Sequence, residues 1–212
     1  MTSKSIRNII FDLGGVILNI DPQLTVEGFR KLGWTNFYEG DNQALAKELF
    51  FRLEQGDSTP ESFRNSVREM INVPLDDDSI DKVWSAMILD IPAERIKYLE
   101  SLRANYRIFI LSNTNEIHRL KFHREFETNF GYPLYDLFER NFYSHLMGMR
   151  KPDPQIYIQA LNEAGILPHE TLFIDDMEVN TEAAKSIGMQ VLNIEPGSLM
   201  EVLPNYLKEL KR

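Results

Sequence analysis

Cysteine is absent from this 212-residue chain, and histidine occurs only four times. Without cysteine there is no disulfide, no thiolate nucleophile and no thiolate metal ligand. The histidines form no His-Glu-x-x-His pair, so we expect them to have packing or surface roles. These absences exclude disulfide-stabilised folds and argue against a zinc enzyme.

Long apolar runs are also lacking. No stretch of the sequence approaches the roughly 20 apolar residues that a helix needs to span a bilayer. Residues 1–8 show no apolar region followed by a small-residue cleavage site, which a secretory signal would have. We therefore expect a cytoplasmic protein without a membrane partner.

Positive charge is scarce. The chain has 32 acidic and 23 basic residues, which gives a net charge of −9. Such a field repels nucleic acid, so we expect no nucleic-acid partner, and a monomer is our default expectation. The excess is concentrated between Asp21 and Asp90, where 14 acidic residues stand against 7 basic ones. A small anionic substrate must therefore be captured by local cations or by a metal ion.

Apolar residues make up 43% of the chain, which is enough for a full hydrophobic core. Short apolar runs of the kind that form strands buried on both faces recur along it, with helical periodicity between most of them. These runs are residues 6–11, 107–111, 141–144, 171–174 and 190–194. The alternation predicts an α/β fold, a doubly wound parallel sheet with helices on both faces.

The connection between the first two predicted strands is unusually long. Residues 21–90 contain helical patterns, such as Leu45, Leu49 and Leu53, but no convincing strand. A crossover of about 90 residues is far longer than a strand-helix-strand unit needs. The sequence therefore predicts a core made of residues 1–18 and 91–212, with a helical cap inserted at 19–90. We expect the aromatic residues Phe50, Phe51 and Trp84 to pack inside this cap.

Polar residues follow the predicted strands at the points where they end. Ligands of open parallel sheets bind at the carboxyl ends of the strands, so these residues are candidate site residues. In chain order they are Asp12, then Ser112, Asn113 and Asn115, then Arg150 and Lys151, and finally Asp175 and Asp176. Together they supply every polar group that phosphoryl transfer needs.

The candidate residues have separable chemical roles. Asp12 can attack phosphorus, and the resulting phosphoaspartate is a mixed anhydride that water hydrolyses in a second step. The carboxylates of Asp175 and Asp176 suit Mg²⁺, a hard cation that prefers oxygen ligands. Lys151 supplies positive charge to the transferring group. Ser112 can donate a hydrogen bond to a phosphoryl oxygen.

Other residues near these positions are candidates for binding or orientation. The backbone amides of Asn113 and Thr114 lie near the start of a helix, a position that favours anions. Asn115 and Arg150 are candidate substrate contacts. Asn180 either orients the acidic pair or lies exposed on a helix.

Together these residues resemble the haloacid dehalogenase superfamily, and the match spans nearly the whole chain. The family's first motif is similar to residues 11–16, its second to Ser112, its third to Lys151, and its fourth to the Asp175-Asp176 pair. The helical insert resembles the cap of one large branch. Within that branch, Asp-Leu-Gly-Gly-Val, Leu-Ser-Asn-Thr-Asn and Gly-Met-Arg-Lys-Pro look similar to sugar-phosphate phosphatases of the glucose 1-phosphate type. The resemblance implies a Mg²⁺ site formed by Asp12, the Gly14 carbonyl and Asp176, with Asp175 behind it.

One position departs from the family pattern. The second Asp of the first motif, the family's usual general acid and base, falls at Gly14. General acid catalysis contributes about 10²–10⁴-fold, so its loss predicts a slower enzyme, a preference for good leaving groups, or a surrogate acid. Asp21 is the nearest surrogate, and water or a substrate group are the alternatives.

The sequence thus favours a magnesium-dependent phosphatase of a small phosphorylated metabolite, with a sugar phosphate as the leading substrate. Gly14 supports one alternative, a catalytically silent regulatory module that binds phosphate or metal. A 2-haloacid dehalogenase is a weaker alternative because that reaction does not need the acidic pair. A phosphomutase normally needs the Asp that Gly14 replaces.

Overall fold

The computed structural model describes residues 6–34 and 41–210. A parallel five-stranded sheet runs through its centre in the order β3-β2-β1-β4-β5. The strands are β1 (Asn8–Phe11), β2 (Arg107–Ser112), β3 (Arg140–Tyr143), β4 (Thr171–Asp175) and β5 (Gln190–Asn193). All five predicted strands are present, with ends shifted by at most two residues, and the predicted doubly wound α/β fold is confirmed.

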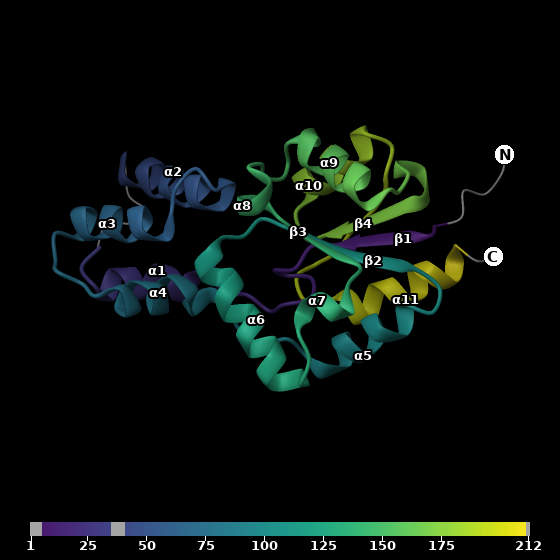
Figure 1. Cartoon of the computed structure of the whole chain (residues 1–212), viewed down its shortest axis with the longest axis horizontal. Coiled ribbons are helices and arrows are strands. Elements are labelled where there is room, and N and C mark those ends of the chain that lie inside the picture. Colours follow the sequence, from purple (N-terminus) through teal and green to yellow (C-terminus); the bar gives the residue numbers. More distant parts are fainter. Residues whose placement is uncertain (1–5, 35–40, 211–212) are drawn as a thin grey trace.

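Helices cover both faces of the sheet, as Figure 1 shows. On one face lie α5 (Ala93–Leu102), α6 (Glu116–Phe130), α7 (Leu134–Leu137) and α11 (Leu199–Glu209). On the other lie α9 (Pro154–Ala164), η2 (Pro168–Glu170) and α10 (Glu178–Ser186). Side chains alternate between the two faces along a strand. Ile9 and Phe11 of β1 therefore pack in a first hydrophobic core, under α5, α6, α7 and α11, whereas Ile10 packs in a second core, under α9 and α10. Both faces of β1 are therefore buried.

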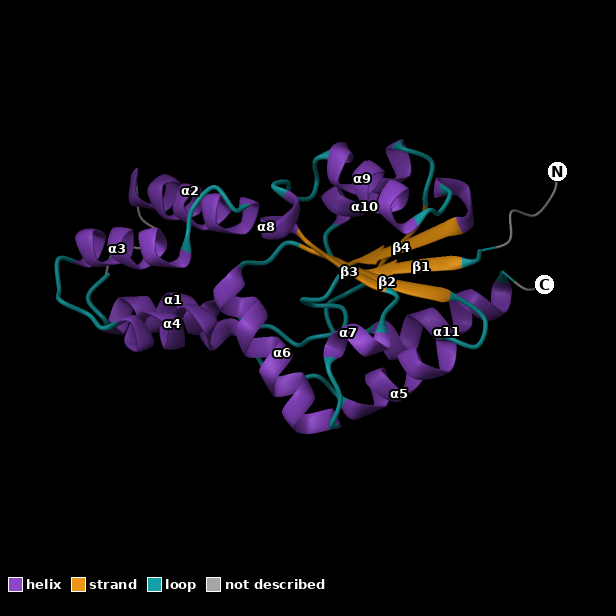
Figure 2. Cartoon of the chain, viewed as in Figure 1, coloured by secondary structure: helices purple, strands orange, loops and turns teal. Residues whose placement is uncertain are grey.

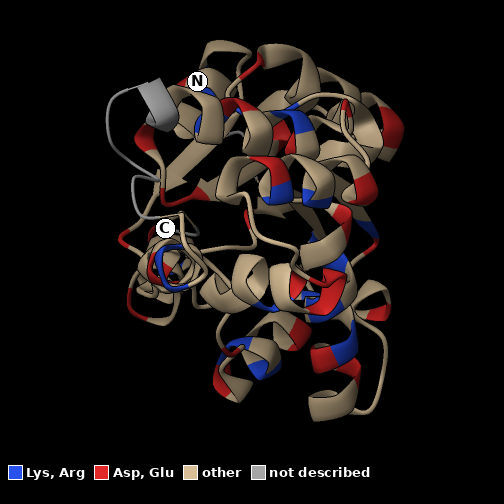
Figure 3. Cartoon of the chain, turned by 90° about the vertical axis from the view of Figure 1, so that its left-hand side faces the viewer, with Lys and Arg blue, Asp and Glu red and all other residues tan. Residues whose placement is uncertain are grey.

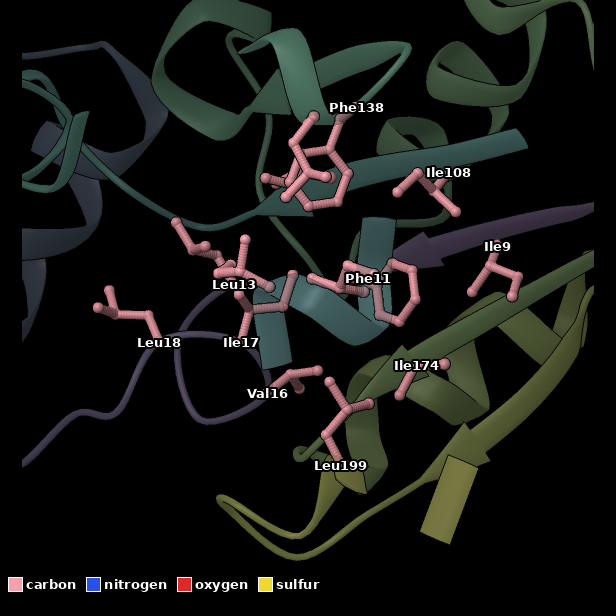
Figure 4. Packing of buried hydrophobic residues seen from close by; sticks show 14 of the residues in the cluster. Ile9, Phe11, Leu13, Val16, Ile17, Leu18, Ile108, Phe138, Ile174 and Leu199 are labelled. Carbon is pink, nitrogen blue, oxygen red and sulfur yellow. The ribbon is translucent and has the colours of Figure 1, made fainter. Parts of the chain in front are cut away.

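The loop after β1 is anchored in the first of these cores. Leu13, Val16 and Ile17 are buried in the same cluster as Phe11 and Leu199, and Figure 4 shows them beyond the end of β1. Burying an aliphatic side chain of this size contributes about 1.5–3 kcal/mol. The residue that follows Phe11 is therefore presented at the strand end by a firmly held loop.

The segment between β1 and β2 carries a second group of helices, seen at the left of Figure 2. They are α1 (Pro22–Lys31), α2 (Asp41–Gln55), α3 (Pro60–Ile71), α4 (Asp77–Trp84) and η1 (Ser85–Met87). Their apolar faces enclose a separate core in which Phe50 stacks on Trp84 at 4.4 Å and Phe63 lies 5.1 Å from Trp84. Below we call these helices the cap; the boundaries at 18/19 and 90/91 stay a prediction.

Both connections to the cap lie side by side. The Asn19 amide donates to the Asp90 carbonyl at 2.9 Å, the Leu89 amide returns a bond to Asn19 at 3.0 Å, and Ile20 bridges Ile88 in antiparallel fashion. Arg95 of α5 grips the entering segment by donating to the Ile17 carbonyl at 3.0 Å and to Asn19 Oδ1 at 2.8 Å. The chain thus enters and leaves the cap through a narrow two-stranded ribbon.

Charged residues of both signs are distributed along the helices (Figure 3). Figure 3 shows acidic and basic residues interspersed on the helices seen from the cap side. None of the helices in the described ranges has the length and apolar character needed to cross a bilayer.

Candidate active site

A buried lysine joins three of the four sequence motifs. The Nζ atom of Lys151 lies 2.9 Å from Asp12 Oδ1 and 2.6 Å from Asp175 Oδ2. Asp12 follows β1, Asp175 ends β4, and Lys151 comes from the loop after α8 (Ser144–Met147). Lys151 is 1% exposed, so it forms these ion pairs away from water. The structure therefore brings together residues that lie far apart in the sequence, as the motif spacing predicts.

Burial and charge act against each other at this cluster. Burial raises the pKa of Asp12 from 3.8 to about 7, although the Lys151 charge opposes the shift. For Lys151 burial favours the neutral form, but the Asp12 and Asp175 carboxylates outweigh it and raise the pKa of the lysine. Lys151 is therefore held as a cation, whereas Asp12 needs further positive charge to ionise fully.

A tight turn shapes the floor of the site. The Leu13 amide donates to Asp12 Oδ1 at 2.7 Å, and the Gly15 amide donates to the Leu18 carbonyl at 2.8 Å. Gly15 has a φ of +77°, and a Cβ atom there would lie 2.5 Å from Asp176 Oδ2. Glycine is required here for its left-handed backbone and because the Asp176 carboxylate packs directly against it.

Three carboxylates converge where a cation could bind. Asp12, Asp175 and Asp176 each offer an oxygen, and these oxygens lie within 4.8 Å of one another. An all-oxygen donor set of this charge fits a hard divalent cation such as Mg²⁺. Without a cation, the three carboxylates would repel a phosphate group. The residues present therefore fit the ion that the sequence predicts.

The acidic pair divides into two kinds of carboxylate. Asp175 is fully buried, and its oxygens accept hydrogen bonds from the Met177 amide at 2.8 Å and from Asn180 Nδ2 at 3.0 and 3.1 Å, besides the bond from Lys151. In the described part of the chain, Asp176 accepts a hydrogen bond only from its own backbone amide, and it is half-buried. This arrangement favours Asp176 as the direct ligand and Asp175 as the residue behind it. Both roles, like that of the Gly14 carbonyl, stay predictions.

Asn180 orients Asp175, which settles the two roles that the sequence left open for it. Its side chain is 6% exposed and its Nδ2 contacts both oxygens of Asp175. Tyr157 of α9 in turn donates its hydroxyl to the Asn180 carbonyl at 2.9 Å. Sequence reasoning missed Tyr157, whose one signal was a polar tip on the apolar face of a predicted helix.

The residues at and after the end of β2 differ in their hydrogen-bond partners. Ser112 is 3% exposed at the strand end, and its hydroxyl has no hydrogen-bond partner among the described residues. The Asn113 side chain accepts from the Lys151 amide at 2.8 Å and donates to the Lys151 carbonyl at 2.9 Å. The Thr114 amide donates to Ser144 Oγ at 2.9 Å, so the expectation that this amide is available to an anion is wrong. The predicted contacts of Ser112 and Asn113 with substrate stay predictions.

Asn115 and Arg150, the other candidate substrate contacts, lie where the core meets the cap. Asn115 is fully buried, caps α6, and accepts a bond from Trp84 Nε1 at 3.3 Å. Arg150 pairs with Glu54 at the end of α2 and lies over the ring of Phe51 at 3.7 Å. Phe51 therefore contacts the core, whereas Phe50 packs inside the cap as expected. Glu54 carried no signal in the sequence.

The surroundings of Gly14 are apolar. A Cβ atom at Gly14 would lie 3.4 and 3.6 Å from two side-chain carbons of Ile20. The carboxylate of Asp21, the nearest surrogate acid in the sequence, caps α1 by accepting from the Gln23 amide at 3.0 Å. Its role as a surrogate stays a prediction.

Comparison with known proteins gives concordant matches. The family model described as haloacid dehalogenase-like hydrolase matches residues 6–188. The sequence is 29% identical to a D-ribitol-5-phosphate phosphatase of Bacteroides thetaiotaomicron over 91% of this chain and 94% of that protein. A crystal structure of a haloacid dehalogenase family enzyme from the same organism superposes with a TM-score of 0.88, at 35% identity, covering 91% of this chain and 95% of that one. The structure of that family enzyme in complex with magnesium and inorganic phosphate superposes with a TM-score of 0.83, at 34% identity, covering 91% and 96%.

Proposed function

Because the chain belongs to the haloacid dehalogenase-like hydrolase family, we propose that it is a phosphatase that hydrolyses a small phosphorylated metabolite through a phosphoaspartate on Asp12. It is a phosphoric monoester hydrolase, and Mg²⁺ is its cofactor. A sugar phosphate or sugar-alcohol phosphate is the leading substrate, supported by the relative that acts on D-ribitol 5-phosphate. The observation that carries the proposal is the bridge of Lys151 between Asp12 and Asp175, beside the carboxylate of Asp176.

In the first step Asp12 attacks the phosphorus atom, and the bond from phosphorus to the ester oxygen breaks. Lys151 offsets the negative charge of Asp12 and of the incoming phosphoryl group. The hydroxyl of Ser112 and the backbone amide of Asn113 donate hydrogen bonds to phosphoryl oxygens at the end of β2. When bound, Mg²⁺ supplies the remaining positive charge that lets carboxylates and phosphate share one site.

In the second step water attacks the phosphorus atom of the phosphoaspartate, which releases inorganic phosphate and restores Asp12. The alcohol leaves without a proton from position 14, because glycine has none to give. Asp21, water or a group of the substrate supplies that proton. The reaction therefore depends more strongly on the leaving group than in enzymes with an acid at that position.

The Asp12→Asn variant tests this mechanism. Its carboxamide occupies the same space but is a poor nucleophile, so we expect phosphate release to fall about 10³-fold or more. Asp136→Asn, an exposed position on α7, is the matched control and keeps wild-type turnover. Equal turnover in Asp12→Asn and wild type would exclude the proposed nucleophile.

The absence of a carboxyl group at Gly14 supports the silent regulatory module as a second candidate. The two candidates differ in turnover on a panel of phosphate esters with Mg²⁺. Phosphate release that stops in EDTA supports the phosphatase, and it also argues against a dehalogenase, which needs no metal. Binding of phosphate without turnover of any ester supports the silent module.

A further inference from the structure

We propose that Glu54 and Arg150 together recognise a hydroxyl group on the leaving alcohol, so that the substrates are phosphate esters of polyhydroxylated alcohols. This inference rests on the proposed phosphatase function and assigns its substrate class. It concerns a contact between cap and core in which the cap residue, Glu54, lies outside the sequence motifs.

The two residues form an ion pair across the junction between cap and core. Glu54 Oε2 accepts from Arg150 Nη2 at 2.8 Å and from Nε at 3.2 Å. Among the described residues it is the one ion pair that joins the cap to the core. Arg150 directly precedes Lys151, the cation that bridges Asp12 and Asp175. The pair therefore stands next to the place where we expect the phosphate to be bound.

The surrounding contacts hold this pair in place. The guanidinium of Arg150 lies 3.7 Å above the ring of Phe51, one turn before Glu54 on α2. Two residues after Glu54, Gly56 packs so tightly that an added Cβ atom would lie 2.3 Å from the His145 carbonyl oxygen of α8. The end of α2 is thus docked on the core at two points, and both charged groups are positioned before a substrate arrives.

Hydrogen-bonding capacity remains on both side chains. Both bonds from Arg150 end on the same oxygen of Glu54, and in the described part of the chain no hydrogen bond reaches Oε1 of Glu54 or Nη1 of Arg150. Each side chain is 21% exposed, so both side chains are partly accessible. Glu54 therefore keeps an acceptor atom, and Arg150 a donor atom, that the ion pair does not use.

The charges decide what fits between them. Burial raises the pKa of Glu54, whereas the charges of Arg150 and Lys151 lower it, which places Glu54 within electrostatic reach of the phosphate site. Because the charges of Glu54 and Arg150 offset each other, the pair gives little net attraction to a second anion or to an amine. A hydroxyl group donates to Glu54 and accepts from Arg150 at the same time. An apolar alcohol would displace water from both groups and leave them unpaired, which is unfavourable.

The test compares two substrates of equal chain length, D-ribitol 5-phosphate and n-pentyl phosphate, with Mg²⁺ in wild type and in Glu54→Gln. The substitution keeps the shape of the side chain and removes its charge. We expect kcat/KM to fall about 10- to 100-fold more on ribitol 5-phosphate than on pentyl phosphate, because one charged hydrogen bond is lost. Glu48→Gln, an exposed position on the same helix, is the control and leaves the ratio between the two substrates unchanged.

The outcomes separate this inference from the function on which it rests. An equal fall on both esters, or no fall on either, overturns the inference, since the ion pair then only holds the cap in place. A wild-type enzyme that releases no phosphate from either ester or from p-nitrophenyl phosphate contradicts the proposed function itself. Thermal unfolding of Glu54→Gln beside Glu48→Gln shows that any change in the ratio arises in a folded protein.

Discussion

The side chain of Asn113 forms two hydrogen bonds with the backbone of Lys151. Its Oδ1 accepts from the Lys151 amide at 2.8 Å, and its Nδ2 donates to the Lys151 carbonyl at 2.9 Å. The asparagine side chain thus pairs with the N–H and C=O groups of one distant residue, as a residue of a neighbouring strand would. The loop after α8 is thereby tied to the end of β2, and the lysine is held over the site.

We expect Asn113→Ala to lower kcat by about tenfold to a hundredfold. Without the two bonds the Lys151 backbone is free to shift, and a displacement of about 1 Å at a reacting group costs on the order of 10²-fold. The measurement is steady-state kinetics with Mg²⁺. Asn162→Ala, on the exposed face of α9, serves as the control and retains wild-type kcat. Unchanged kcat in Asn113→Ala would show that Lys151 needs no such support.

Gly15→Ala should abolish activity, whereas Gly131→Ala should not. Both glycines have left-handed backbones, with φ of +77° and +79°, so each substitution costs about 1–2 kcal/mol of stability. A Cβ atom at Gly15 would collide with Asp176, but one at Gly131 meets nothing within 4 Å. Isothermal titration with Mg²⁺, together with chemical unfolding, separates the two effects. Equal Mg²⁺ affinity in both variants would contradict the close packing of Asp176 on Gly15.

Gly14→Asp introduces the carboxyl group that the family pattern has at this position. An added Cβ atom is in ordinary contact with Ile20, so the substitution needs only a small adjustment. We expect kcat on alkyl phosphates to rise by about tenfold or more relative to p-nitrophenyl phosphate, whose phenolate leaves without protonation. Gly14→Asn is the control, because it has the same shape without an acid. A ratio that is equal in both variants would show that protonation of the leaving group does not limit the rate.

His118 makes the free energy of unfolding depend on pH. Burial lowers the pKa of its ring from 6.5 to about 4, and the ring stacks on Trp84 with Nε2 3.0 Å from the Trp84 carbonyl oxygen. The folded pKa lies below the unfolded one, so this contribution is complete above pH 6.5 and is lost as the pH falls towards 4. The loss reaches about 3 kcal/mol.

Denaturant unfolding of wild type and His118→Phe at pH 7 and pH 4.5 tests this assignment. Phenylalanine keeps a ring beside Trp84 but does not titrate. We expect the difference in unfolding free energy between the two pH values to be smaller in the variant. Other groups titrate in both proteins, so only the difference between them reports on His118. The same pH dependence in both proteins would rule out His118 as its source.

Local patterns in the sequence were enough to predict the strands and the positions of the motif residues. The strands are short apolar runs with polar residues at their ends, and this pattern alone places Asp12, Ser112 and Asp175 at one edge of the sheet. The ion pair of Arg150 with Glu54 joins residues 96 positions apart, and no periodicity reports such a contact. The same holds for Tyr157 beneath Asn180, because a tyrosine on a helix gives no sign of its partner.

The prediction for the Thr114 amide was wrong because a backbone amide near a helix start has several possible hydrogen-bond partners. The Thr114 amide lies near a helix start, as expected, but the Ser144 hydroxyl reaches it from the end of the next strand. Asn115 follows the second motif, and its oxygen accepts from the His118 amide and from Trp84 Nε1, while its contact with substrate stays a prediction. Which partner is chosen depends on the packing of helices and loops that are distant in sequence.

The ribbon at Asn19 and Asp90 makes the inserted helices interchangeable in principle. The two backbones are one hydrogen bond apart at Asn19 and Asp90, so a short turn could also close this junction. We expect that an insert of another size or sequence, joined at the same two residues, would leave the sheet and the residues at its strand ends in place. Under the proposed function, the part that would select the alcohol could then change separately from the part that would cleave the ester, and Arg150 is a residue at which the two parts meet.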